Sequence, residues 1–529
     1  MAISGIIRHS PACLIATTII ETQTLIWFFN ITLRLRIFFP DIPGTRSFFG
    51  LNIIHLLSRI AMSQSDIPAI EEQIPAPINT LFVEILTCIF HMCVLEHGPY
   101  FQRLDVNDRS GPWKLGQVCS LWRQIANNTP SLWTRLSLTD SDVVRDPVSR
   151  FKIALERSSC LALNLELSLG DAYPLEVQRE IYQLAIAHSW RWEHLTITPS
   201  HLILPFLSDI RRHQLHKLTR LVVHCHNLWT PLNINAFQDA PALRTVELHT
   251  NYAGALFELP WNHIVEFFDF RSWGDSESVH RVLDIIQQSP NVQILRVPII
   301  CSSPATAVSL PTPLVRSSLR DLTACEGPIL RSLVVPRLEK ISLAPGEDAT
   351  DYCPDDALPA LLDLIQRSRC SLTSLELADV IFTDLLLDIL HCTQGIKTLI
   401  IFTQGWESGY DRIFKALIHR LVLHPAPQQS FLPLLSDLNI TVSDFLMEES
   451  CSFIDHTFFD MVSSRWNSGV LSAVKLDVSE PGEALSWGLT SEHISKFRKF
   501  KNNGLDIKLG VLRHDNNTTG FSSRRTRYV

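Results

Sequence analysis

Apolar and polar residues alternate in a short unit that recurs along most of the chain. An amphipathic segment is followed by a run of the form Leu-x-Leu, as in 165–167 and 375–377. Strict alternation predicts a strand with one buried face, whereas a period of 3.6 residues predicts a helix. The alternating pairs are Leu136/Leu138, Leu165/Leu167, Leu195/Ile197, Leu221/Val223, Val246/Leu248, Phe268/Phe270, Leu295/Val297, Leu322/Ala324, Ile341/Leu343, Leu375/Leu377, Leu399/Ile401, Leu438/Ile440 and Val474/Leu476.

Amphipathic segments lie between these runs, notably Pro174–His188, Ser276–Gln288 and Asp355–Ser368. Helix followed by strand, with the strands side by side, requires parallel pairing and crossover helices on the outside. Most intervals between strands are close to the period of leucine-rich repeats. We therefore expect an irregular leucine-rich-repeat-like α/β solenoid over residues 139–512, with an ordinary open α/β sheet as the alternative.

Two blocks near the front of the chain follow a helical pattern. In 81–93, apolar residues at Leu81, Ile85, Leu86, Ile89, Phe90 and Cys93 fall on one helix face. A second helix is predicted over Leu115–Ala126 and ends before Pro130, because proline disfavours helical geometry in the residue before it. Two or three short helices bury too little surface to be stable alone, so this unit packs on the rest of the chain or on a partner.

These blocks resemble the F-box of the large F-box families of mushroom-forming fungi. The resemblance lies in Leu-x-x-Glu-Ile-Leu at 81–86, Val-Cys-x-x-Trp-Arg-x-Ile-Ala at 118–126 and Thr-Pro-x-Leu-Trp at 129–133. It implies an all-α F-box at 75–138 that binds a Skp-type adaptor and, through it, a cullin–RING ubiquitin ligase. The adaptor-binding residues that it implies are Leu81, Ile85, Leu86, Ile89, Val118, Cys119, Trp122, Leu132 and Trp133.

The chain departs from the family pattern at two points. Phe82 stands where the family usually has proline, and the segment from Glu96 to Pro112 is longer than the usual linker. The alternative interpretation is that the helices are only the core of a larger helical domain. The resemblance implies a non-catalytic substrate receptor of an SCF-type (Skp–cullin–F-box) ligase, in the cytoplasm or nucleus. An F-box-like scaffold outside the ligase is the alternative function.

Composition narrows these possibilities. The hydrophobic fraction of 46% and the charged fraction of 19% are typical of a folded chain, and a net charge of −8 gives no electrostatic case for binding nucleic acid. The twelve cysteines show no zinc-ligand spacing, so we expect free thiols in a reducing compartment and no metal or other cofactor.

The two ends of the chain differ from the rest. Residues 1–61 contain apolar runs interrupted by Glu21, and Met62 opens a polar segment that leads into the F-box. We expect residues 1–74 to be a poorly ordered leader, or residues upstream of a working start at Met62, and expect no membrane span. A targeting segment, or an enzyme or membrane protein anchored by these residues, is a further alternative. The tail, 513–529, is locally basic and is expected to be disordered.

Catalytic motifs are lacking in the sequence: it contains no Gly-rich phosphate loop, Gly-x-Ser-x-Gly elbow or His-Glu-x-x-His helix. Asp355 and Asp356 are expected to cap the helix that follows, rather than to act as a catalytic pair. The chain is therefore predicted not to be an enzyme.

The solenoid instead offers a surface for a protein target. The middle residues of the strands are candidates for its open face, and loop aromatics are candidate anchors. The strand residues are Thr196, Val222, Glu247, Asp269, Arg296, Thr323, Ser342, Glu376, Ile400, Asn439 and Lys475, and the loop aromatics are Trp229, Tyr252, Trp273 and Trp406. Each of them could also be an ordinary solvated or core residue.

Overall fold

The structure is a computed structural model of the 529-residue chain. It describes residues 81–95, 111–140, 145–170, 172–200, 202–210, 214–225, 232–250, 255–270, 273–274, 276–301, 312–346, 352–407, 409–423, 430–442, 452–480 and 488–513. The expected leader, the residues before Met62 and the tail beyond Arg513 lie outside these ranges. The chain divides into two compact units, Met1–Trp192 and Glu193–Val529.

The described part of the first unit begins with a small helical bundle. It then continues as helix and parallel strand, with Leu136 paired to Leu165 and Leu138 to Leu167. Its elements are α3 (Val83–Leu95), α4 (Gly111–Val118), α5 (Ser120–Asn127), the 3-10 helix η2 (Pro130–Trp133), β1 (Arg135–Thr139), α6 (Pro147–Arg157), β2 (Leu163–Ser168), α7 (Leu175–Ala187) and η3 (Ser189–Arg191).

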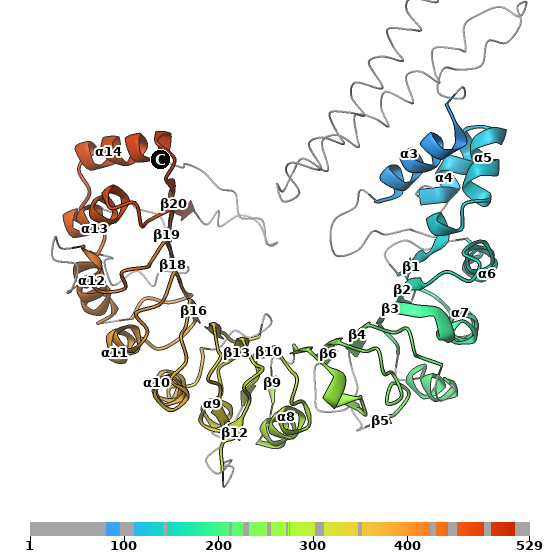
Figure 1. Ribbon diagram of the computed structural model, residues 1–529, viewed down its shortest axis with the longest axis horizontal. Coiled ribbons are helices and arrows are strands. Elements are labelled where there is room, and N and C mark those ends of the chain that lie inside the picture. Colours follow the sequence, from blue (N-terminus) through green and yellow to red (C-terminus); the bar gives the residue numbers. More distant parts are fainter. Residues whose placement is uncertain are drawn as a thin grey trace, which may run out of the picture. The chain divides into compact units, whose positions relative to one another are not determined.

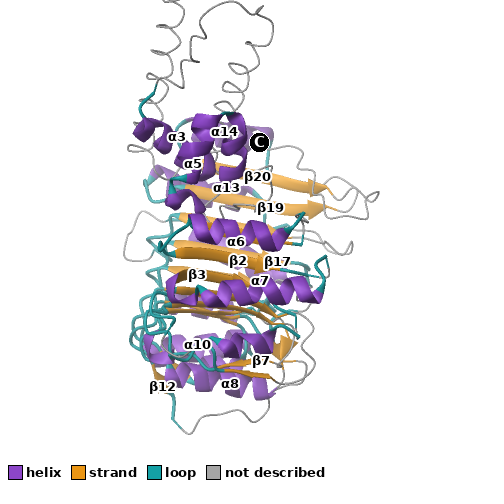
Figure 2. Ribbon diagram, turned by 90° about the vertical axis from the view of Figure 1, so that its right-hand side faces the viewer, coloured by secondary structure: helices purple, strands orange, loops and turns teal. Residues whose placement is uncertain are grey.

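The second unit is an array of parallel strands in which spatial order follows chain order (Figures 1 and 2). Its main strands are β3 (Trp192–Ile197), β4 (Arg220–Cys225), β6 (Thr245–Thr250), β8 (Glu266–Asp269), β10 (Ile294–Val297), β13 (Asp321–Ala324), β15 (Lys340–Leu343), β16 (Ser374–Ala378), β17 (Thr398–Thr403), β18 (Asp437–Val442), β19 (Ala473–Glu480) and β20 (Asp506–Arg513).

Helices cover one side of this sheet and leave the other side open (Figure 1). They are η4 (Leu204–Asp209), η5 (Trp261–His263), α8 (Ser276–Gln288), α9 (Gly327–Arg331), α10 (Ala357–Ser368), α11 (Leu385–Cys392), α12 (Tyr410–Leu421), α13 (His456–Asn467) and α14 (Ser491–Asn502). Three short parallel pairs complete the unit: β5 (Leu232–Ile234) with β7 (Ala255–Phe257), β9 (Trp273–Gly274) with β11 (Ile300–Cys301), and β12 (Leu314–Val315) with β14 (Leu333–Val334).

The apolar residues of the strands stack in register and form the core against the helices. Leu375 pairs with Leu399, and Leu399 with Leu438; all three are almost fully buried. Burying such a side chain stabilises the fold by about 1.5–3 kcal/mol. The expectation of a solenoid-like α/β fold with parallel strands is confirmed in this coarse form.

Arginines join successive repeats by capping the carboxyl end of the preceding helix. Arg465 of α13 is fully buried and donates to the carbonyl oxygens of Leu421, Leu432 and Phe431 at 2.6, 2.9 and 2.6 Å. Burial lowers the pKa of its guanidinium to about 10. A cation that binds the last carbonyls of a helix satisfies acceptors that the helix leaves open and opposes its dipole.

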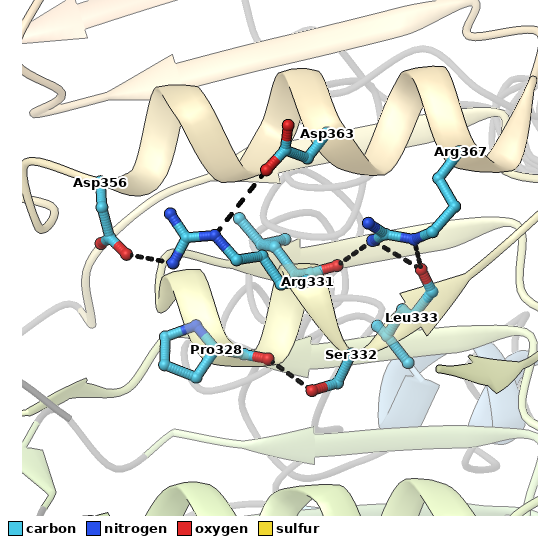
Figure 3. A network of polar contacts seen from close by, with 8 residues as sticks. Pro328, Arg331, Ser332, Leu333, Asp356, Asp363 and Arg367 are labelled. Carbon is cyan, nitrogen blue, oxygen red and sulfur yellow. Dashed lines mark hydrogen bonds and ion pairs between the residues drawn. The ribbon is translucent and has the colours of Figure 1, made fainter. Parts of the chain in front are cut away.

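The same contact recurs between α9 and α10 (Figure 3). Arg367 donates to the carbonyl oxygens of Leu330, near the end of α9, and Leu333, at the start of β14, at 3.0 and 2.9 Å. In return, Arg331 of α9 forms an ion pair of 2.6 Å with Asp356, at the start of α10. That pair is half exposed and contributes about 1 kcal/mol or less, so the carbonyl contacts of Arg367 are the stronger link.

Asp356 meets the capping expectation in its position but not through a hydrogen bond. It occupies the N-cap position of α10, but its side chain makes no capping hydrogen bond. The carboxylate instead pairs with Arg331 of the preceding repeat. The ion pair with Arg331 therefore replaces the hydrogen bond that the Asp356 carboxylate could have accepted from the backbone of α10.

Replacing Arg465 by Met should destabilise the second unit by about 3 kcal/mol or more, because three buried carbonyl groups lose their donor. Hydrogen exchange of α12 and α13 should accelerate accordingly. Arg316 is the matched control: it donates to the carbonyls of Ile286 and Gln287 but is half exposed, so water can replace it. Equal effects of Arg316→Met and Arg465→Met would contradict the role given to burial.

Candidate functional site

The first candidate surface lies on α3. Its inner side is sealed, because Leu86, Phe90 and Val94 are almost fully buried. Residues one step around the helix remain open to solvent: Ile85 is 38% exposed, and Ile89, four residues on, is half-buried. The helix therefore carries a second apolar stripe beside the one that forms the core of the bundle.

The second helical block is broken where a single helix was expected. Cys119 has an extended backbone and caps α5, its Sγ accepting from the backbone N–H of Trp122 at 3.5 Å. This break separates α4 from α5, so the expectation of one helix over Leu115–Ala126 is wrong. Val118, the last residue of α4, is left 54% exposed at the break.

Aromatic side chains hold the bundle together from inside. The indole of Trp122 packs on Phe90 with ring centroids 4.8 Å apart. The indole N–H of Trp133 donates to the carbonyl oxygen of Ala126 at 2.7 Å, which ties η2 to the end of α5. Arg157 of α6 lies 4.6 Å from the Trp133 ring centroid, and such a cation–π contact adds about 0.5–2 kcal/mol.

The nine residues implied for adaptor binding thus fall into three groups. Ile85 and Val118 are exposed, whereas Leu81, Ile89 and Cys119 are half-buried. The other four are buried and support the surface from beneath: Leu86, Trp122, Leu132 and Trp133.

Two further exposed apolar residues extend this surface at the start of α3. Phe82 is 80% exposed and Val83 is 51% exposed. We call Phe82, Val83, Ile85 and Val118 the exposed apolar set. The sequence singled out Phe82 only as a departure from the family pattern; its position just ahead of the helix is the signal that could have found it.

The second candidate surface is the open face of the sheet in the second unit. The expected alternation is confirmed at Arg296, which is exposed. It is also confirmed at seven partly exposed residues: Glu247, Thr323, Ser342, Glu376, Ile400, Asn439 and Lys475. Three other expectations for this face are wrong, because Thr196, Val222 and Asp269 are buried.

The error at Asp269 comes from the register of β8. Phe267 pairs with Val246 and Leu295, and it is 1% exposed, as is Asp269. Phe268 therefore lies on the open face, where the sequence pattern had placed it in the core. A shift of one residue moves every side chain of a strand to the opposite face.

This register makes a direct prediction for two adjacent phenylalanines. Phe267→Ala should cost about 3–5 kcal/mol of folding free energy because it leaves a core cavity. Phe268→Ala should cost about 1 kcal/mol or less, which is the scale of a stacked aromatic contact. Urea unfolding of the two variants measures both, and the reverse order would contradict the register.

The open face of β4, β6 and β8 carries stacked planar side chains. The rings of His224 and His249 are 4.2 Å apart and 18° from parallel, and those of His249 and Phe270 are 4.7 Å apart and 19° from parallel. Phe270 in turn stacks on Phe268 at 6.1 Å. We call His224, His249, Phe268 and Phe270 the ring ladder. Cys225 points the other way and is buried, which raises the pKa of its thiol to about 12.

Glu247 lies in the same region with its carboxylate already bonded on both sides. It binds His249 Nε2 at 2.9 Å and Arg220 at 2.7 Å. The hydrogen bond with His249, and secondarily the charge of Arg220, lower the pKa of this carboxyl despite partial burial. This pair of contacts fixes the His249 ring against the sheet.

The loop aromatics expected as anchors are not supported by burial. Trp406 is 4% exposed and packs on Tyr410, Phe414 and Phe453, so it belongs to the core. Trp229 and Tyr252 lie outside the described residues, and only the backbone of Trp273 is described, in β9.

Within the described ranges, no three or more His, Cys, Asp or Glu side chains are grouped so as to hold a metal ion. None of the helices in that part of the chain has the length and apolar character needed to cross a bilayer.

No protein-family model matches the chain, and no curated protein matches it. The function is therefore inferred from the helical bundle of α3, α4 and α5 and from the open face of the sheet.

Proposed function

We propose that the chain is the substrate-recognition subunit of an SCF-type ubiquitin ligase. In this proposal the bundle of α3, α4 and α5 is an F-box that binds a Skp-type adaptor. The observation that carries it is the exposed apolar set on this bundle, at and beside positions where the sequence resembles the F-box.

Solvent exposure of these side chains supports a partner. Burying one aliphatic or aromatic side chain of this size is favourable by about 1.5–3 kcal/mol. Much of this stabilisation is not realised in the isolated chain for four exposed side chains: Phe82, Val83, Ile85 and Val118. Three of these four lie within four successive positions, Phe82 to Ile85, and exposed large apolar residues that lie close together are typical of protein–protein interaction sites.

The strand array supports the second half of the proposal, which is target binding. Its open face presents partly exposed polar and aromatic side chains, and among the described elements no helix lies over them (Figure 1). The chain itself performs no bond chemistry in this scheme. Holding a target beside a charged ubiquitin-transferring enzyme raises the effective concentration of the reacting groups.

Surface substitutions test adaptor binding. Ile85→Asp combined with Val118→Asp should weaken binding of a purified Skp-type adaptor at least about 30-fold, because about 2 kcal/mol of apolar contact is lost. Biolayer interferometry with the full chain measures this. Trp122→Ala does not test adaptor contact, because Trp122 is 4% exposed and its loss would disrupt the packing of the bundle.

Leu434→Asp is the matched control, because Leu434 is a similarly exposed apolar residue, 52% open, in the second unit. It should bind the adaptor as the wild type does. If wild-type protein binds no Skp-type adaptor at micromolar concentrations, the ligase proposal is wrong and the scaffold alternative is favoured.

Cysteine labelling gives an independent test with unmodified protein. Cys88 of α3 is an exposed thiol three residues after Ile85, so a bound adaptor should slow its alkylation. Cys160 and Cys392 are also exposed and serve as internal controls whose rates stay unchanged. Mass spectrometry of the alkylated peptides reports all three, and unaltered labelling of Cys88 in the saturated complex would place the adaptor elsewhere.

A further inference from the structure

The ring ladder is a surface that neither sequence nor resemblance assigns to a ligand. Its four rings lie on three neighbouring strands or, for Phe270, directly after one of them, and Arg296 of the next strand, β10, extends it. The Arg296 guanidinium is centred 5.2 Å from the Phe268 ring centroid, and its side chain is 45% exposed. A planar cation thus continues a row of planar rings on an open sheet face.

Arg296 keeps hydrogen-bonding capacity in this position. A guanidinium stacked on an aromatic ring uses its π face, and its N–H donors point outward in the plane. Asp321 reaches one of them at only 4.0 Å, which is longer than a hydrogen bond. Carboxylates bind the edge of a guanidinium with two parallel N–H···O bonds, so the remaining donors fit a carboxylate.

The neighbouring charges restrict the direction of approach. Glu266 and Asp321 both pair with Ile294, so they lie toward the amino ends of their strands. Toward the carboxyl ends lies the row of His224, His249 and Phe270. An acidic group therefore reaches Arg296 most favourably over the ring ladder, where the carboxylate of Glu247 already forms an ion pair with Arg220 and a hydrogen bond with His249.

We propose that the ring ladder and Arg296 bind an extended segment of a target protein that carries an aromatic side chain and a carboxylate side chain two residues apart. The aromatic group packs edge-to-face on the outward edges of Phe268 and Phe270, because their ring faces already contact one another, His249 and Arg296. The carboxylate binds the edge of Arg296. Phe268 and Arg296 are register partners on adjacent strands, which are about 4.8 Å apart. In an extended segment, side chains on one side recur about every 6.6 Å. This is longer than the step between the strands, and the long side chain of Arg296 covers the difference.

A protein segment fits this surface better than a nucleic acid does. Glu266 of β8 and Asp321 of β13 lie on the two strands that flank Arg296, and they would repel a dense row of phosphates. A single carboxylate needs only the one cation. This binding chemistry deepens the proposed receptor role, because it specifies the kind of target segment. It rests on the proposed function only in calling the bound protein a target of the receptor.

Peptide selection on the immobilised full chain tests the proposal. From a library of random linear peptides, the selected sequences should be enriched in an aromatic residue two positions from Asp or Glu. A synthetic selected peptide should bind wild-type protein in fluorescence polarisation and lose at least about tenfold in affinity for Arg296→Gln. The Phe268→Ala variant should lose a similar factor.

Matched controls separate recognition from folding. Lys508→Gln removes an exposed cation from the same sheet face on β20 and should leave peptide affinity unchanged. A peptide with its acid replaced by the amide should bind weakly and equally to wild type and Arg296→Gln, since the two changes remove one contact. Circular dichroism and the melting temperature of each variant confirm the fold.

The proposal is overturned if the selected peptides lack the aromatic–acid pair, if none is enriched, or if polyphosphate or single-stranded RNA competes the peptide away. It is also overturned if Arg296→Gln binds the acidic peptide as tightly as wild type. Adaptor binding by the bundle is measured separately on the same protein. Loss of adaptor binding with intact peptide binding would sink the ligase proposal alone, and the reverse result would sink only this one.

Discussion

Parallel pairing in strict register is the constraint on which the rest of this structure depends. In the second unit, Leu221, Val246, Phe267 and Leu295 follow one another as direct partners across four strands. Because the period of a strand is two, one face of every strand then packs on the helices and the other stays open. Both the core and the candidate target surface follow from this single alignment.

The repeats differ in length, yet contacts between neighbours keep them in line. Arg191 in the first unit, and Arg316, Arg367 and Arg465 in the second, each donate to carbonyl groups at the end of a preceding helix. In an array where each repeat contacts mainly its neighbours, stability is approximately a sum of repeat and interface contributions. An arginine that satisfies the open carbonyls of the helix before it strengthens such an interface without fixing the length of the loop between.

The sequence predicted the strands because Leu-x-Leu alternation reports burial directly, and twelve of the thirteen pairs have the expected phase. The strand prediction failed at β8. Phenylalanines stand at both odd and even positions there (Phe267, Phe268 and Phe270), so hydrophobicity alone does not decide which face is buried. The fold buried a carboxylate there and left two phenylalanines half open, because register with the neighbouring strands decides the phase. In the bundle, periodicity found the helices but could not separate Leu86, which is sealed, from Ile85, which is exposed.

The account of function centres on the bundle of α3, α4 and α5 as a surface that a second protein completes. Titration calorimetry of the full chain with a purified Skp-type adaptor, at several temperatures, tests this most directly, because burial of apolar surface on binding gives a negative heat-capacity change. The account predicts saturable binding of one adaptor with such a change. Absence of binding heat at every temperature, or binding with no heat-capacity change, would contradict it.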